Sequence, residues 1–211
     1  MKIKSQVLVT QTYEVVKAMI LNQELTPGSK ILQHQLAEDI GVSRTPLRSA
    51  LTQLEAENLV LAIPRQGFYV RKFSKREIYD LFDCRIALES KAAELFATHR
   101  SAEDLAFVEG LFAGFSTNID PLTYKEADGQ FHAHIINNCG NAFLTEIVNR
   151  SSMLHNIDMI GLVRPPEVTL EEHREILAAI REQDPEAASE AMKNHLLKSK
   201  ILIKEQVDYA E

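Results

Sequence analysis

The chain has few of the features of a secreted or membrane protein. Only 2 of its 211 residues are cysteine, which excludes a framework of several disulfides. We expect Cys84 and Cys139, which lie in helical patterns, to be reduced, buried thiols, and a single structural disulfide is the alternative. No apolar run reaches the length of about 18 residues that a membrane span needs. The N-terminal lysines are not followed by the apolar stretch that a signal peptide would have, so we expect a cytoplasmic protein.

Acidic and basic residues are unevenly distributed along the chain. The formal net charge is -7, yet residues 1–73 contain nine Lys or Arg and six Asp or Glu. The rest of the chain holds the other 14 basic and 24 acidic residues. The basic residues 1–73 suit an anionic partner, and the acidic rest of the chain is repelled by such a partner. We therefore predict two domains, 1–73 and 74–211.

Residues 41–48, with the sequence GVSRTPLR, separate two short helical patterns. The apolar positions of these patterns are Leu36, Ala37 and Ile40, then Leu47, Leu51 and Leu54. Two helices joined by a glycine-containing turn predict a helix-turn-helix, whose second helix lies in the DNA major groove. Ser43 is a favourable N-cap because its hydroxyl can accept a backbone N–H. Arg44 and Arg48 are four residues apart, so they share one face of the second helix.

Two β-prone runs, residues 59–63 and 68–70, follow this motif around a PRQG turn. They predict a β-hairpin, and a hairpin directly after a helix-turn-helix is a wing. Arg65 lies at the predicted tip, where it can reach a phosphate or the minor groove. The alternative is a winged helix that makes only protein contacts.

With these motifs, residues 8–72 resemble the winged-helix domain of the GntR family of bacterial transcriptional regulators. The matching positions are Pro27-Gly28, Leu36-Ala37, residues 41–48 and Gly67. The resemblance implies that the residues nearest DNA include His34, Arg44, Thr45, Arg48, Gln66 and Gly67, and we add the flanking Ser43 and Arg65. The chain has His34, Ser49 and Asn58 where the family often has Arg, Glu and Gly. We expect His34 to shift the operator sequence rather than to abolish DNA binding.

Residues beyond 73 have helical periodicity throughout. We expect six helices of about 15–25 residues, enough to bury a sizeable core. Their predicted starts are Ser74, Ser101, Asp120, Asn141, Thr169 and Asp184, with the fourth helix continuing until Arg164-Pro165-Pro166 interrupts it. The predicted fold is mainly α: an N-terminal winged helix-turn-helix with a short β-hairpin wing, followed by an all-α helical bundle.

Four side chains of the second domain have spacings that could bring them together. Asp128 and His132 are four residues apart, so on a helix they point the same way. His173 and His195 flank a tight Asp-Pro turn at similar distances, and antiparallel helices would place them at one height. One carboxylate and three imidazoles suit a divalent transition metal such as Zn²⁺, Ni²⁺ or Mn²⁺. The alternative is three unrelated histidines, each hydrogen-bonded separately.

Residues 75–206 resemble the all-helical effector domain, called FCD, of the FadR subfamily of GntR regulators. The landmarks are the RIALE sequence at 85–89, Asp128-x-x-x-His132, Asn141, Glu172-His173 and His195-Leu196. In the metal-binding branch the corresponding Asp and three His coordinate the ion. The resemblance therefore implies a metal held by Asp128, His132, His173 and His195.

An ion that prefers six ligands would keep open positions for a carboxylate effector. Arg85 is the candidate partner of that effector because a guanidinium binds a carboxylate bidentately. Its alternative partner is Glu89, four residues further along the helix. We expect Glu172 to face away from the site, which leaves no general base beside the metal.

These features predict a transcriptional regulator rather than an enzyme, and in this family more often a repressor. A homodimer would bind a pseudo-palindromic double-stranded operator. A small organic acid bound at or beside the metal would lower the affinity of the homodimer for the operator. The alternatives are a metal-free regulator that binds a longer acyl ligand, a metal sensor, and a metal-dependent hydrolase. No membrane partner is expected.

Overall fold

The chain forms two compact units in a computed structural model that describes residues 3–116, 118–151 and 153–205. The units are Met1–Lys72 and Phe73–Glu211, whereas the sequence predicts a division one residue later. No helix in the described ranges is both long and apolar enough to cross a membrane.

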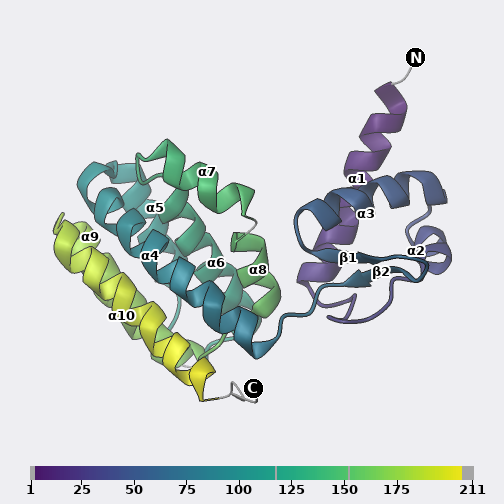
Figure 1. Cartoon of the computed structure of the whole chain (residues 1–211). Helices are drawn as coiled ribbons and strands as arrows, with labels where there is room; N and C mark the ends of the chain where they lie inside the picture. The colour runs from purple at the N-terminus through teal and green to yellow at the C-terminus, as the bar shows by residue number, and fades with distance from the viewer. Residues whose placement is uncertain (1–2, 117, 152, 206–211) are drawn as a thin grey trace. The chain divides into compact units, whose positions relative to one another are not determined.

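The first unit is a small helical domain with one β-hairpin (Figure 1). Its elements are α1 (Ile3–Leu21), α2 (Gln33–Asp39), α3 (Arg44–Ala56), β1 (Val60–Ile63) and β2 (Gly67–Val70). The strands are antiparallel, with Val60 opposite Val70. Lys30 also forms an isolated antiparallel β-bridge with Tyr69, which the sequence pattern did not predict. The predicted winged helix-turn-helix is confirmed.

Local sequence explains how α3 is placed. Leu47, Leu51 and Leu54 recur at helical spacing and are fully buried. Gly41 has a φ of +70°, a conformation that glycine adopts at no steric cost, and it turns the chain between α2 and α3. Ser43 occupies the N-cap of α3, but its side chain makes no cap hydrogen bond. The predicted hydroxyl cap is therefore wrong, because this exposed side chain can be solvated instead.

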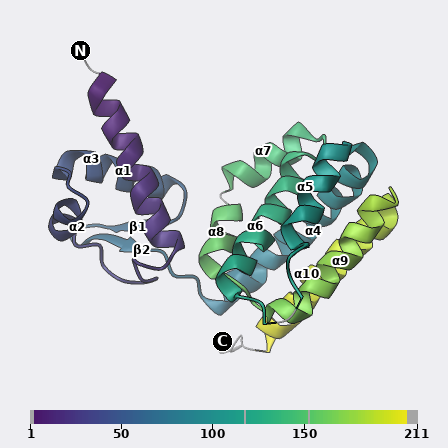
Figure 2. The ribbon, with the colours of Figure 1, turned by 180° about the vertical axis from the view of Figure 1, so that it is seen from behind.

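The second unit is a helical bundle, seen from two sides in Figures 1 and 2. Its described helices are α4 (Lys75–His99), α5 (Ala102–Phe112), α6 (Pro121–Asn137), α7 (Ala142–Arg150), α8 (Met153–Ile160), α9 (Pro166–Arg181) and α10 (Pro185–Lys204). The predicted caps of five of them accept backbone hydrogen bonds through their side chains: Ser74, Ser101, Asp120, Asn141 and Asp184. The all-α bundle is confirmed.

Two predicted helix limits are wrong. The helix expected from Asn141 to the residue before Pro165 is divided into α7 and α8, although no glycine or proline occurs in residues 141–160. Thr169 does not cap α9, because α9 already begins at Pro166, whose fixed φ suits a first helical turn. Thr169 lies inside the helix, and its Oγ1 is hydrogen-bonded to Tyr124 Oη at 2.9 Å.

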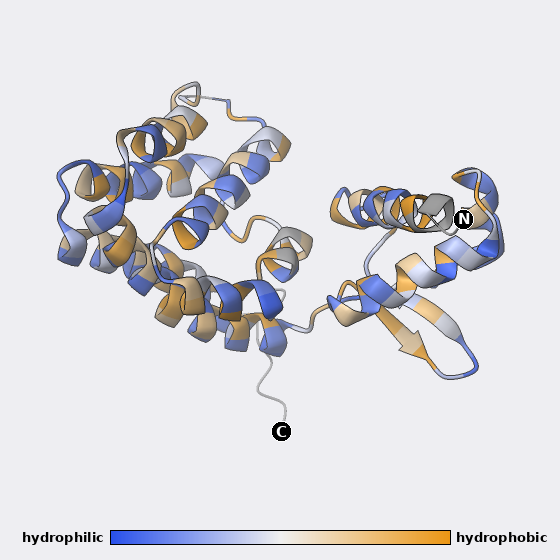
Figure 3. Ribbon diagram, turned by 90° about the horizontal axis from the view of Figure 1, so that it is seen from above, coloured by the Kyte–Doolittle hydropathy of each residue, from blue (hydrophilic) through white to orange (hydrophobic). Residues whose placement is uncertain are grey.

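Amphipathic helices enclose the core of the second unit. α10 packs along α4, and α9 runs beside α10. Hydrophobic and hydrophilic residues alternate along the helices, as the colours of Figure 3 show. The fully buried aromatic side chains Phe96, Tyr124 and Phe131 fill the interior. The four side chains predicted to bind a metal lie on three helices of this bundle, so the packing of the helices fixes their positions.

The two cysteines differ in burial. Both are free, and Cys139 is buried as predicted, but Cys84 is exposed. The prediction fails at Cys84 because Phe82, Arg85 and Glu89 take the inward side of α4.

Candidate DNA interface and candidate metal centre

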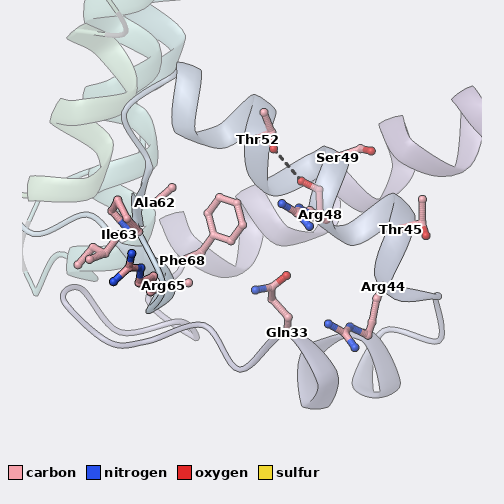
Figure 4. A pocket seen from close by; sticks show the side chains of 12 residues that line it. Gln33, Arg44, Thr45, Arg48, Ser49, Thr52, Ala62, Ile63, Arg65 and Phe68 are labelled. Atoms are coloured by element: carbon pink, nitrogen blue, oxygen red, sulfur yellow. Dashed lines mark hydrogen bonds between the residues drawn. The ribbon is translucent and has the colours of Figure 1, made fainter.

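A hollow of about 930 Å³ separates α3 from the hairpin in the first unit. Arg44, Thr45 and Arg48 line it from α3, and Arg65 and Gly67 line it from the hairpin (Figure 4). None of the residues that line it is acidic. Three exposed guanidinium groups around one hollow can bind phosphates and base edges of a nucleic acid.

The other predicted DNA-binding residues lie outside the lining of this hollow. His34 is exposed on α2, with its Nδ1 3.4 Å from Glu38 Oε2. Ser43 is exposed at the start of α3, and Gln66 accepts a hydrogen bond from Tyr69 Oη at 3.3 Å.

Sequence reasoning missed three polar residues that line the hollow: Gln33, Ser49 and Thr52. Gln33 is the first residue of α2, and Figure 4 shows its side chain facing the same space as the arginines. Ser49 follows Arg48 on α3, so the helical spacing from Thr45 to Ser49 could have identified it.

Four potential metal ligands converge inside the second unit. Asp128 and His132 come from α6, His173 from α9 and His195 from α10. Each offers one ligand atom, and these atoms all lie within 4.8 Å of one another. The three histidines are buried and Asp128 is partly exposed. The structure thus brings together all four residues of the predicted set.

Each histidine has a second residue close to its Nδ1 atom. The distances are 2.5 Å from His132 to Glu89 Oε2, 2.8 Å from His173 to Tyr124 Oη and 2.8 Å from His195 to Glu172 Oε2. The carboxylates of Glu89 and Glu172 can only accept, so they favour an Nδ1–H group that leaves the lone pair on Nε2. The Tyr124 hydroxyl can accept from His173 Nδ1 or donate to it. Sequence reasoning missed Glu89 and Tyr124 in this role and placed Glu172 wrongly. Glu172 faces the ring of His195 because α9 packs against α10.

The buried nitrogens favour a metal at this cluster. His132 Nε2 and His173 Nε2 are buried, and neither has a hydrogen-bond partner within the described residues. His132 Nδ1 also lacks hydrogen-bond geometry, although it lies close to the Glu89 carboxylate. An unpartnered buried polar atom is costly. A cation at the centre would satisfy both Nε2 nitrogens, so these residues fit a divalent transition metal.

Burial and nearby charges set the protonation states of these groups. Burial lowers the pKa of His173 well below its ordinary value, and neighbouring positive charges lower it further. Burial also lowers the pKa of His195, although its hydrogen bond to Glu172 opposes the shift. Both imidazoles are therefore neutral near pH 7, which is the form that binds a metal.

Arg85 has the partner that we considered as its alternative. Its Nε donates to Glu89 Oε1 at 2.6 Å, and both side chains are buried. Burial alone would raise the pKa of Glu89, but Arg85 and His132 lower it to about 2. Arg85 also lines a cavity of about 30 Å³ beside Asp128 and His132. An effector that reached Arg85 would have to compete with Glu89.

His134 does not join the cluster. Its Nε2 lies 2.9 Å from Asp104 Oδ1, and its ring stacks on Phe107 at a centroid distance of 4.4 Å. These contacts agree with its position on the other side of α6 from His132.

Both units match known families. Residues 8–70 match the family described as "Bacterial regulatory proteins, gntR family", and residues 80–198 match the "FCD domain". The HTH-type transcriptional regulator YdhC of Bacillus subtilis (strain 168) is 27% identical over 192 residues, which cover 88% of this chain and 86% of YdhC. The HTH-type transcriptional repressor GlaR of Escherichia coli (strain K12) is 27% identical over 199 residues, covering 88% and 90%.

The fold is also that of solved structures. A GntR transcriptional regulator from Rhodococcus sp. RHA1 superposes with a TM-score of 0.81 at 19% identity, covering 95% of this chain and 99% of that one. The homologues and both domains are those of transcriptional regulators and not of enzymes.

Proposed function

Because the chain belongs to the GntR family of bacterial transcriptional regulators with an FCD domain, we propose that it is a cytoplasmic, homodimeric repressor controlled by a small organic acid. The acid binds at or beside a divalent metal in the FCD domain. Its binding lowers the affinity of the winged heads for their operator. The convergence of four ligand atoms within 4.8 Å carries this proposal.

The proposed DNA contacts are made by α3 and the wing. Arg44, Thr45 and Arg48 enter the major groove from the exposed side of α3, whose opposite side is buried. Arg65 and Gly67 on the wing follow the backbone or the minor groove. His34, Ser43 and Gln66 supply further contacts at the edge of this surface.

The proposed metal ligands are Asp128, His132, His173 and His195. Zn²⁺, Ni²⁺ and Mn²⁺ accept this combination of carboxylate and imidazole. When bound, the ion supplies a Lewis-acidic centre with open positions for a carboxylate. Glu89, Tyr124 and Glu172 hold the imidazoles in the orientation and tautomer that coordination needs.

The regulation follows from linkage. If the acid binds better to the form of the dimer that binds DNA weakly, it lowers operator affinity. The operator must then lower the affinity for the acid by the same factor. The coupling requires two conformations and a difference in affinity between them, and it requires no contact between the acid and DNA.

A binding experiment tests this function. An operator is selected from genomic fragments, and its affinity for full-length, Zn²⁺-loaded protein is measured by fluorescence anisotropy. Acetate, lactate, malate and citrate are then added separately at constant ionic strength. We expect at least one acid to weaken operator binding, and the operator to weaken binding of that acid equally. Unchanged operator affinity with all four acids would contradict control by these effectors and leave DNA binding itself intact.

A further inference from the structure

The cavity beside the four-ligand cluster is too small for an organic acid. Its volume of about 30 Å³ admits roughly one or two water molecules. Residues 161–164, in the segment that joins α8 to α9, form one side of it. A carboxylate can therefore reach the cluster only if something that lines the cavity moves.

Arg164 ties this connecting segment to two helices. Its Nη1 and Nη2 donate to Glu172 Oε1 and Oε2 on α9 at 2.8 and 2.5 Å. Its Nε donates to Ser199 Oγ on α10 at 2.8 Å, and its Nη2 donates to the carbonyl oxygen of His195 at 2.9 Å. The side chains of Arg164 and Glu172 are each 8% exposed. This guanidinium closes the segment over the cavity.

Arg85 and Arg164 both line the cavity, and each is paired with a glutamate. The two glutamates differ in the contacts that they would keep if their arginine moved away. Glu89 is 1% exposed, and within the described residues Arg85 is the only Lys or Arg paired with it. Opening that pair would leave a deeply buried carboxylate with His132 alone, which is strongly unfavourable. Glu172 also contacts Lys198 Nζ at 3.0 Å and His195 Nδ1 at 2.8 Å. Glu172 would keep both of these partners after Arg164 leaves.

The ends of the segment suit a local movement. Gly161 has a φ of +76°, and a Cβ at this position would meet no atom within 4 Å. Glycine at this end can therefore change its backbone angles at low steric cost. Pro165 and Pro166 at the other end fix the start of α9. Rotation about Gly161 would lift Arg164 without unwinding α9.

We propose that Arg164 is the residue that both closes the effector site and binds the carboxylate of the effector. An entering carboxylate replaces the Glu172 carboxylate on the Arg164 guanidinium, and residues 161–164 move away from the cavity. During this exchange Glu172 keeps its ion pair with Lys198 and its contact with His195 Nδ1. The inference deepens the proposed function and rests on it, because it takes the four-ligand cluster as the effector site.

Full-length protein loaded with Co²⁺, used as a spectroscopic substitute for the resident metal, tests the exchange. Acetate is the probe, titrated at constant ionic strength and followed through the visible absorption of Co²⁺. Arg164→Gln removes the guanidinium, and Arg164→Lys keeps the charge without the bidentate geometry. Glu172→Gln removes the competing carboxylate charge. Arg150→Gln is the control, because Arg150 is exposed and pairs only with Glu146 in the described structure.

We expect acetate affinity to change in opposite directions in the Arg164 and Glu172 variants. Acetate affinity should fall at least about tenfold in Arg164→Gln and less in Arg164→Lys, because a guanidinium binds carboxylate more strongly than an ammonium at a bidentate site. It should rise severalfold in Glu172→Gln, because Arg164 no longer has an internal competitor. Arg150→Gln should match the parent. A residue with a merely structural role would give losses in both Arg164→Gln and Glu172→Gln.

Each contrary result has its own meaning. If the parent binds Co²⁺ but acetate affinity is the same in Arg164→Gln, or falls in Glu172→Gln, the exchange is overturned and the metal site remains. If Co²⁺ is bound and acetate leaves its spectrum unchanged, the exchange is likewise overturned. If the parent takes up no Co²⁺, the proposed function fails and the exchange fails with it. Should Arg164→Gln not fold, the comparison of Arg164→Lys with Glu172→Gln decides by the same opposite signs.

Discussion

At the scale of single residues, the guanidinium groups of α3 and the wing differ from the buried arginines of the bundle. Within the described residues, no carboxylate forms an ion pair with Arg44, Arg48 or Arg65, although each is exposed. Arg85 and Arg164 are instead buried in pairs with glutamates. A guanidinium without an internal partner can bind an external anion without first giving up an ion pair.

Replacing Arg44 by alanine should weaken operator binding. If Arg44 contacts a guanine edge bidentately, the loss is about 1–3 kcal/mol, or roughly 5- to 150-fold in dissociation constant. Fluorescence anisotropy with the selected operator and with a scrambled duplex measures it. Arg150→Ala, far from α3 in the sequence, is the control. Equal operator affinity in Arg44→Ala and the parent would show that the recognition helix is assigned wrongly.

Replacing Tyr124 by phenylalanine should weaken metal binding while the fold is retained. The change removes the hydroxyl that is hydrogen-bonded to His173 Nδ1 at 2.8 Å. Loss of such an outer partner lowers metal affinity about 10- to 100-fold. Competition with a chromophoric chelator measures the affinity, and Tyr69→Phe in the other unit is the control. An unchanged affinity would show that Tyr124 does not orient the ligand.

At the scale of secondary-structure elements, the wing and α3 should contribute differently to DNA binding. α3 presents Arg44 and Arg48 from a rigid helix whose other side is packed, so its contacts can be specific. The wing presents Arg65 from a two-stranded hairpin tip, where its φ is +65°. A contact from such a tip to the phosphate backbone adds affinity for any sequence.

Arg65→Ala should therefore weaken binding to operator and scrambled duplexes by similar factors. The slope of log affinity against log salt concentration should become shallower by about one, because one phosphate contact is lost. Measurement at several salt concentrations separates this effect from that of Arg44→Ala. A loss confined to the operator would mean that Arg65 reads bases.

The elements also show which features the sequence could predict. Gly41, the leucines of α3 and the turn at residues 64–67 give local signals, so the winged helix was predictable. The side-chain caps at Ser74, Ser101, Asp120, Asn141 and Asp184 were predictable for the same reason. The break between α7 and α8 was not, because neither glycine nor proline marks it. Tertiary packing decides such breaks, and it overrides local propensity.

The candidate metal centre shows a similar limit. Asp128 and His132 are joined by helical spacing, and the Asp-Pro turn places His173 near His195. Two of the outer partners, Glu89 and Tyr124, come from helices that no local pattern links to the histidines they contact. Glu89 lies on α4 and its apparent partner was Arg85, so its contact with His132 becomes visible only when α4 and α6 are packed together.

At the scale of the whole molecule, the two units divide the work expected of a ligand-controlled regulator. The basic excess lies in the first unit and the acidic excess in the second. This distribution favours approach of the first unit to DNA and disfavours approach of the second. The second unit contains the buried polar cluster, which is unusual in a core unless it serves a ligand.

The central claim is that Asp128, His132, His173 and His195 hold a metal, and metal content per chain tests it most directly. Untagged full-length protein is dialysed without chelator and analysed for transition metals, together with the double variant His132→Ala plus His173→Ala. His134→Ala is the matched control, because His134 lies on α6 and pairs with Asp104. We expect about one ion per chain in the parent and in His134→Ala, and none in the double variant. A parent that holds no metal, and takes up none when Zn²⁺, Ni²⁺ or Mn²⁺ is supplied, would contradict the claim.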